Sequence, residues 1–162
     1  MKALVVYDST YGNTERVARA IGDAILGDVE LRRAGQVDAR DLVDIEMLIV
    51  GSPTQGGRPT PAMKQFLDSI PARGLQGVEV AAFDTRISAA DKFFVLKLFL
   101  NAVGYAADRI AAGLKAKGGH LLSEPQGFIV EGKEGPLRQS ETQRAARWGC
   151  QLGKARKPAA AG

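Results

Sequence analysis

The sequence predicts an α/β domain built around a doubly wound parallel sheet. Short apolar runs alternate with amphipathic helical segments from residue 1 to about residue 152. The first run, at 3–7, is apolar on both faces, which is typical of a strand buried on both sides. Strands joined by helical crossovers form a parallel sheet with helices on each face. We therefore expect one three-layer domain with five strands.

The strands are indicated by short apolar runs that end at polar residues, glycine or proline. The run at 29–33 has polar residues at alternate positions, as expected for an edge strand. The fifth run is interrupted by Ser123, Glu124 and Pro125. In chain order we expect strands over 3–7, 29–33, 47–50, 78–83 and, in two pieces, 120–122 and 128–130.

The helices are indicated by apolar residues that recur every three or four positions. Pro61 stands in a first turn, where proline is favoured, and Gly118 follows the end of a helical pattern. Trp148 falls on the inward face of the last helix, so we interpret it as a core residue. In chain order we expect helices over 14–25, 60–70, 105–117 and from 135 to about 152, with a short helical turn over 37–42.

A loop rich in hydroxyl groups joins the first strand to the first helix, with the sequence D-S-T-Y-G-N at 8–13. Free N–H groups and the positive end of the helix dipole make such a helix start an anion site. Ser9, Thr10 and Thr14 can add hydroxyl donors, and Gly12 allows a turn that larger residues resist. The alternative interpretation is that Ser9 and Thr10 only cap the helix.

The loop lacks two common phosphate-binding motifs, and their absence excludes two kinds of anionic ligand. A nucleoside-triphosphate loop needs G-x-x-x-x-G-K-[ST], and a dinucleotide site needs G-x-G-x-x-G. The loop has one glycine and no lysine. It therefore fits the terminal phosphate of a phosphate monoester.

Three segments carry a family resemblance. The segment Y-D-S-T-Y-G-N-T-E-R-V-A at 7–18 resembles the phosphate loop of the flavodoxin family, and G-S-P-T-Q-G-G-R-P-T-P-A at 51–62 and F-D-T-R at 83–86 resemble its second and third flavin loops. They occur in the family's order. The resemblance implies the flavodoxin-like strand order 2-1-3-4-5, with FMN bound at the carboxyl edge of the sheet near the first and third strands.

The resemblance also implies roles for residues in these loops. The first loop would hold the FMN phosphate, and the other two would enclose the isoalloxazine ring. The peptide between Gly56 and Gly57 would turn a carbonyl toward flavin N5, so that the flavin cycles through a semiquinone. Asp84, Thr85 and Arg86 would contact the pyrimidine edge. The implied cofactor-binding residues are Ser9, Thr10, Tyr11, Gly12, Asn13, Thr14, Pro53, Thr54, Gln55, Gly56, Gly57, Asp84, Thr85 and Arg86.

One position departs from the family's pattern. Gln55 stands where an aromatic side chain often stacks on the flavin. Such stacking contributes about 0.5–1.5 kcal/mol beyond area burial, so we expect weaker but not abolished binding of FMN. Tyr11, Phe93 and Phe94 are the candidates to replace it.

The function implied is an FMN-binding electron-transfer protein that exchanges electrons with a redox partner protein. Two alternatives stay open, which are an FMN-dependent NAD(P)H:quinone or flavin reductase and a flavin-free interaction domain of the same fold. A phospho-receiver domain is excluded, because Gly51 and Ser52 stand where it needs an aspartate.

Composition limits the class of protein further. The net charge is +4, but no basic patch interleaved with aromatic residues suggests nucleic-acid binding. No apolar run reaches the ~20 residues that span a bilayer. The N-terminal apolar run is too short for a signal sequence. Cys150 is the only cysteine and His120 the only histidine, so we expect no metal site and a cytoplasmic location.

Two further segments carry expectations. The segment 88–103 is apolar on nearly all sides of a helix, with Lys97 and Asn101 on a narrow polar edge. It either packs under the following helix or docks a redox partner or a second copy of the chain. We expect the domain to end at 153 and a disordered basic tail to follow over 154–162.

Overall fold

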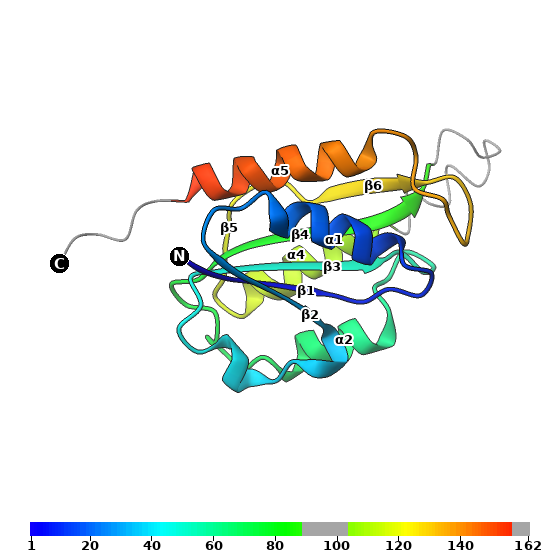
Figure 1. Cartoon of the computed structure of the whole chain (residues 1–162). Coiled ribbons are helices and arrows are strands. Elements are labelled where there is room, and N and C mark those ends of the chain that lie inside the picture. Colours follow the sequence, from blue (N-terminus) through cyan, green and yellow to red (C-terminus); the bar gives the residue numbers. More distant parts are fainter. Residues whose placement is uncertain (89–103, 157–162) are drawn as a thin grey trace.

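A parallel sheet lies at the centre of the structure, a computed structural model that describes residues 1–88 and 104–156. The order is β2-β1-β3-β4-β5, and β6 pairs with β4 beyond β5, which confirms the predicted order and the interrupted fifth strand. Figure 1 shows the arrangement. The strands are β1 (Lys2–Tyr7), β2 (Asp28–Arg33), β3 (Met47–Pro53), β4 (Glu79–Ile87), β5 (His120–Leu121) and β6 (Gln126–Val130).

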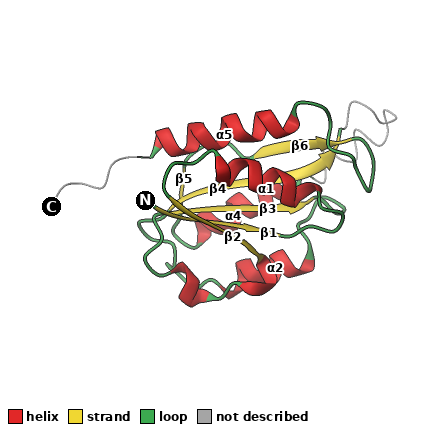
Figure 2. Ribbon diagram, viewed as in Figure 1, coloured by secondary structure: helices red, strands yellow, loops and turns green. Residues whose placement is uncertain are grey.

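Helices cover both faces of the sheet (Figure 2). Side chains alternate along each strand, so Val5 and Ile49 pack with helices α1 (Asn13–Asp23) and α5 (Glu141–Ala155). Leu4 and Leu48 face the other way and pack with α2 (Pro61–Ser69) and α4 (Ala106–Ala116). The result is two hydrophobic cores separated by the sheet, which confirms the three-layer prediction. The short 3₁₀ helix Ala39–Leu42 lies where a helical turn was predicted over 37–42, and a second 3₁₀ helix, Ala34–Gln36, precedes the predicted range.

The α1/α5 layer depends on one close approach and one aromatic cluster. A Cβ at Gly149 would overlap the backbone of Ile21, so glycine lets α5 lie directly against α1. Trp148 lies 6.3 Å from Phe83 and 6.2 Å from Phe128, measured between ring centroids. Its indole N–H donates to Ser123 Oγ at 3.0 Å. Trp148 is therefore a core residue, as interpreted from the sequence.

The first residue of α5 ties that helix to β6. The N–H of Ile129 donates to Glu141 Oε2 at 2.6 Å, and Arg144 donates to both carboxylate oxygens. Burial by itself raises the pKa of Glu141, but these hydrogen bonds outweigh it and hold the pKa below its ordinary value of 4.5.

Two element boundaries differ by four residues or more from those expected. Strand β4 continues through Ile87 instead of ending at Phe83, because residues 83–87 pair with β6. Helix α5 begins at Glu141 and not at Gly135, because Leu137 forms an isolated bridge with Val130 and the chain first makes a turn. Both differences bring additional residues to the carboxyl edge of the sheet.

Several expectations concern the ends of the described ranges. Helix α5 ends at Ala155, past the expected domain boundary at 153, and residues 157–162 lie outside the described residues. The apolar segment predicted at 88–103 also lies outside them, except for Ser88. Within residues 1–88 and 104–156, no helix has both the length and the apolar character needed to cross a membrane.

Candidate functional site

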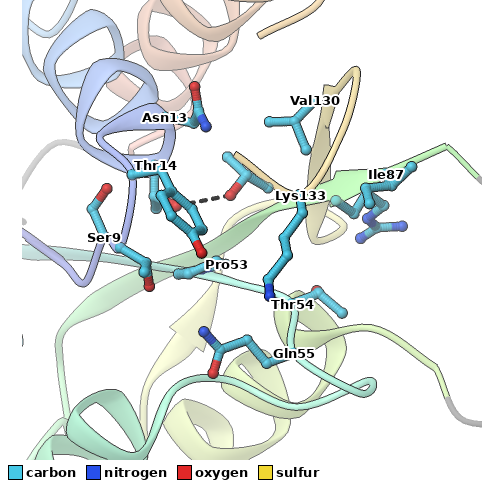
Figure 3. A pocket seen from close by; sticks show the side chains of 13 residues that line it. Ser9, Asn13, Thr14, Pro53, Thr54, Gln55, Ile87, Val130 and Lys133 are labelled. Carbon is cyan, nitrogen blue, oxygen red and sulfur yellow. Dashed lines mark hydrogen bonds between the residues drawn. The ribbon is translucent and has the colours of Figure 1, made fainter. Parts of the chain in front are cut away.

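A pocket of about 330 Å³ lies at the carboxyl ends of β1, β3, β4 and β6 (Figure 3). The strand register brings its walls together, because Pro53 pairs with Thr85 and Ile87 pairs with Val130. The lining residues come from three loops and two strand ends. They are Ser9, Thr10, Tyr11, Asn13, Thr14, Pro53, Thr54, Gln55, Thr85, Arg86, Ile87, Val130 and Lys133.

The first loop presents an uncapped helix start to this pocket. Gly12 is the N-cap residue of α1 with φ of 92°, a left-handed conformation that glycine adopts without strain, and no side chain caps the helix. Ser9 Oγ instead accepts the N–H of Gly12 at 3.0 Å. The alternative that Ser9 and Thr10 only cap α1 is therefore not what the structure shows.

Charged and polar side chains hold the first loop from both flanks. Arg33, at the end of β2, donates to the carbonyl of Ser9 at 3.1 Å and lies 3.6 Å from the Asp8 carboxylate. Thr60, the N-cap of α2, donates to the other oxygen of Asp8 at 2.5 Å. These contacts fix the loop before any ligand arrives, so little ordering remains to be done on binding. The sequence interpretation did not include Arg33.

The floor of the pocket contains a buried pair of hydroxyls. Thr14 Oγ1 and Thr85 Oγ1 lie 2.8 Å apart, and the two residues are 1% and 4% exposed. The bond joins the first turn of α1 to β4. It brings the predicted first and third ligand segments into direct contact.

The second loop is a tight hairpin. Gln55 and Arg58 exchange two backbone hydrogen bonds of 2.8 and 3.1 Å, and the two residues between them, Gly56 and Gly57, have φ of 57° and 78°. Positive φ at both central positions is the requirement of a type I′ turn. The carbonyl of Gly57 accepts Arg109 Nε from α4 at 3.0 Å.

The third segment places a buried ion pair behind the pocket wall. Arg86 donates to both oxygens of Asp84 at 2.7 and 2.8 Å, and Asp84 also accepts the N–H of Ala107 at 2.9 Å. Burial raises the pKa of Asp84, and these hydrogen bonds oppose the shift. The Arg86 guanidinium lies 3.6 Å from the centre of the Tyr105 ring. Asp84 thus joins β4 to the start of α4, while Arg86 reaches the pocket.

The structure brings together most residues that the sequence suggested. Ten of the fourteen candidates line the pocket, while Gly12, Gly56, Gly57 and Asp84 do not. Gly12 shapes the first loop, the two glycines form the hairpin turn, and Asp84 holds Arg86. Three lining residues were missed, namely Ile87, Val130 and Lys133. Since Phe93 and Phe94 lie outside the described residues, Tyr11, 47% exposed at the pocket, is the aromatic candidate that the structure places there.

The chemistry of the wall favours an anionic ligand with an apolar part. The described lining residues include five hydroxyl-bearing residues of the first and third segments, two cations and no carboxylate. Pro53, Ile87 and Val130 add apolar surface beside the Tyr11 ring. A hydroxyl-lined, uncapped helix start suits a phosphate, and the adjacent apolar wall suits a planar ring.

Comparison with known proteins identifies the family. A family model described as flavodoxin matches residues 5–148. The chain belongs to the flavodoxin family. A flavodoxin from Clostridium saccharobutylicum is 34% identical over 94 residues, which cover 56% of this chain and 59% of that protein. Alignments with the curated flavodoxins cover between 40% and 61% of their lengths, so they span about half of those proteins.

Solved flavodoxin structures share the fold along nearly the whole chain. A flavodoxin from the domain Archaea has a TM-score of 0.71 at 27% identity and covers 95% of this chain and 97% of its own. Flavodoxin 1 from Bacillus cereus has a TM-score of 0.75 at 19% identity, covering 97% and 100%, and shows the fold alone. The cofactor of flavodoxins is FMN, a phosphate monoester with a planar ring. The residues that line this pocket fit both of its parts.

Proposed function

We propose that this flavodoxin is an electron carrier whose FMN occupies the pocket at the carboxyl edge of the sheet. The uncapped start of α1, beside Ser9, Thr10 and Thr14, supports a phosphate position there. The carboxylate-free lining of the described pocket is the observation that carries the proposal, since it suits a dianionic phosphate.

The ring would lie between the second loop and β4. Pro53, Thr54 and Gln55 would form one side, Tyr11 would supply aromatic surface, and Thr85 and Arg86 would contact a polar edge. When bound, FMN supplies the electron-transfer chemistry. The protein binds and orients it, and the rigid pocket walls keep that orientation.

The hairpin turn suits a second, finer role in the same proposal. Gln55 and Arg58 fix the turn at its base, and Arg109 holds the carbonyl of Gly57. The peptide between Gly56 and Gly57 is then the group that can reorient, at little steric cost because both residues are glycine. Turned toward the bound ring, the carbonyl of Gly56 could then accept a hydrogen bond from a protonated flavin N5.

The partner and the location belong to the proposal as well. A carrier needs a redox partner protein, and the mouth of the pocket is the surface nearest to the cofactor. A cytoplasmic location agrees with the single cysteine, Cys150, which is free.

Titration of the purified protein with FMN and with riboflavin, followed by flavin fluorescence, tests the proposal. Riboflavin lacks the phosphate, so we expect much weaker binding. Replacing the exposed Thr10 by valine removes one donor to a charged group, and we expect FMN to bind about ten- to hundredfold more weakly. Thr142→Val, an equivalent change on the exposed face of α5, is the matched control and should leave the affinity unchanged.

The outcomes separate the candidate functions. Equal affinity for FMN and riboflavin would refute the phosphate assignment, and no binding of either would favour a flavin-free interaction domain. Stepwise reduction that accumulates a one-electron state supports a carrier. Direct two-electron reduction with rapid turnover of NAD(P)H and a quinone would instead support a reductase.

A further inference from the structure

Lys133 lies at the corner of a tight turn between β6 and α5. The N–H of Gly135 donates to the carbonyl of Gly132 at 3.1 Å, which closes a four-residue turn with Lys133 in its second position. The N–H of Glu131 donates to the carbonyl of Pro136 at 2.9 Å and closes the base of the turn. The backbone that carries Lys133 is therefore fixed on both sides.

The same turn is attached to the phosphate loop. Asn13 Nδ2 donates to the carbonyl of Glu134 at 3.1 Å. The fit is close, because a Cβ at Gly135 would lie 2.7 Å from Asn13 Nδ2. Lys133 thus starts from a position set by the same helix terminus that would hold the FMN phosphate.

The side chain of Lys133 is directed across the pocket. Figure 3 shows it extending from the turn toward the Thr54 side, with its ammonium end away from Ser9. It therefore points to the region between the second loop and β4, where the ring is proposed to lie, and not to the proposed phosphate position.

The charge of Lys133 is not neutralised within the described part of the chain. Arg86, the other cation of the lining, is paired with Asp84 at 2.7 Å. Glu131 is paired with Arg138 at 3.0 Å. No carboxylate among the described residues forms an ion pair with Lys133, so nothing in 1–88 or 104–156 compensates the positive charge that this side chain brings to the pocket.

We propose that Lys133 stabilises the fully reduced flavin relative to the oxidised flavin and so raises the reduction potential of the bound cofactor. The inference rests on the proposed function, namely that FMN occupies this pocket. Full reduction adds two electrons, taken from a redox partner, and one proton at N5, which leaves one negative charge on the ring. The oxidised ring is neutral, so a nearby ammonium group attracts the reduced form selectively.

A contact with the phosphate would behave differently. The phosphate carries the same charge in both redox states, so an ammonium group bound to it would strengthen the binding of oxidised and reduced FMN equally. The affinities for the two redox states therefore distinguish a lysine at the ring from a lysine at the phosphate.

The test compares Lys133→Gln with Lys115→Gln in the full-length protein. Lys115 is exposed in the last turn of α4, at the end of that helix away from the pocket, so its replacement changes the net charge equally. Binding of oxidised FMN is measured by fluorescence, and potentials are measured by spectroelectrochemical titration. For Lys133→Gln we expect an unchanged affinity for oxidised FMN and an affinity for fully reduced FMN about tenfold weaker. For this two-electron reduction, a tenfold change lowers the midpoint potential by about 30 mV.

Lys133→Glu should lower the midpoint potential further than Lys133→Gln does, and added salt should diminish the change in potential for both variants. Lys115→Gln should match the unsubstituted protein. Equal potentials for Lys133→Gln and the unsubstituted protein, both with FMN bound, would overturn this inference and leave the proposed function standing. Equal weakening of both redox states would also overturn it, in favour of a phosphate contact. Failure of the unsubstituted protein to bind FMN would overturn the proposed function together with the inference.

Discussion

The buried pair of Thr14 and Thr85 offers a direct test of how the pocket is held together. The two hydroxyls lie 2.8 Å apart, although the residues are 71 positions apart in the sequence. Replacing either residue by valine keeps the shape of the side chain and removes one hydroxyl. The remaining hydroxyl then stays buried without its partner.

The expected magnitude follows from that burial. Leaving a buried polar group unpaired costs about 1–3 kcal/mol, whereas replacing both partners by apolar groups of similar shape is nearly neutral. Each single variant should therefore lower the free energy of unfolding by about 1–3 kcal/mol. The double variant should lose less than the sum of the two, with a coupling of about 1–3 kcal/mol.

Denaturant unfolding of the ligand-free protein, followed by circular dichroism, measures these differences. Thr142→Val, on the exposed face of α5, should change the stability by less than about 0.5 kcal/mol. FMN titration of the same variants adds a second measurement. If the Thr14 hydroxyl also donates to the phosphate, Thr14→Val weakens FMN binding more than Thr85→Val does.

Strict additivity of the two single effects would refute the reasoning, because it would mean that neither hydroxyl depends on the other. The refuting result is a double variant whose loss of stability equals the sum of the two single losses. Equal FMN affinities for all three variants would confine the pair to a structural role.

Other contacts lead to further expectations. Glu141→Gln should lower the free energy of unfolding by about 1–3 kcal/mol at neutral pH. The folded-state pKa of Glu141 lies below its ordinary 4.5, so the stability that the carboxylate contributes is complete above pH 4.5 and is lost as the pH falls through the folded-state value. Unfolding measured at several pH values should therefore show the stability difference between Glu141→Gln and the unsubstituted protein shrink in acid. Gly149→Ala should lower the free energy of unfolding by about 1–3 kcal/mol, since a Cβ overlaps the backbone of α1. Gly153→Ala is the matched control, because its Cβ would lie 3.9 Å from the side chain of Ile25, and it should be neutral or stabilising by up to about 1 kcal/mol. Gly57→Val should diminish the one-electron state during stepwise photoreduction, because a β-branched residue resists φ of 78°. An undiminished one-electron state would remove the hairpin from the redox role.

The sheet and its helices could be predicted because their apolar periodicity is local. Apolar runs that include Val5 and Ile49 predict buried strands, and Pro61 predicts the start of a helix. Neither prediction requires knowing which segment packs against them. The end of β4 could not be found this way. Residues 84–86 are polar in sequence, but they form a strand because β6 supplies hydrogen-bonding partners from more than forty positions later.

The site shows the same division. Ser9, Thr10 and Thr14 were predictable, because hydroxyls before an amphipathic helix form a local pattern. Lys133 was not, since it comes from a turn that is more than a hundred positions from Asn13 in the sequence and is joined to it by the contact between Asn13 and Glu134. The start of α5 was also predicted wrongly, although S-E-T-Q at 140–143 has the S-x-x-Q spacing of a helix N-terminus.

The pocket lies where the two separate cores of the flavodoxin meet. Thr85 joins the α1 side through Thr14, while Asp84 and Arg86 are held by Ala107 and Tyr105 at the start of α4. Without a ligand, the two helical layers are connected through the sheet, and each can open locally without breaking the core of the other. A cofactor bound in the pocket as proposed would contact residues held by both layers, so that opening either layer would also break contacts with the ligand. FMN should therefore turn two partly independent layers into one cooperative unit, with amide exchange slowed in α1 and in α4 together.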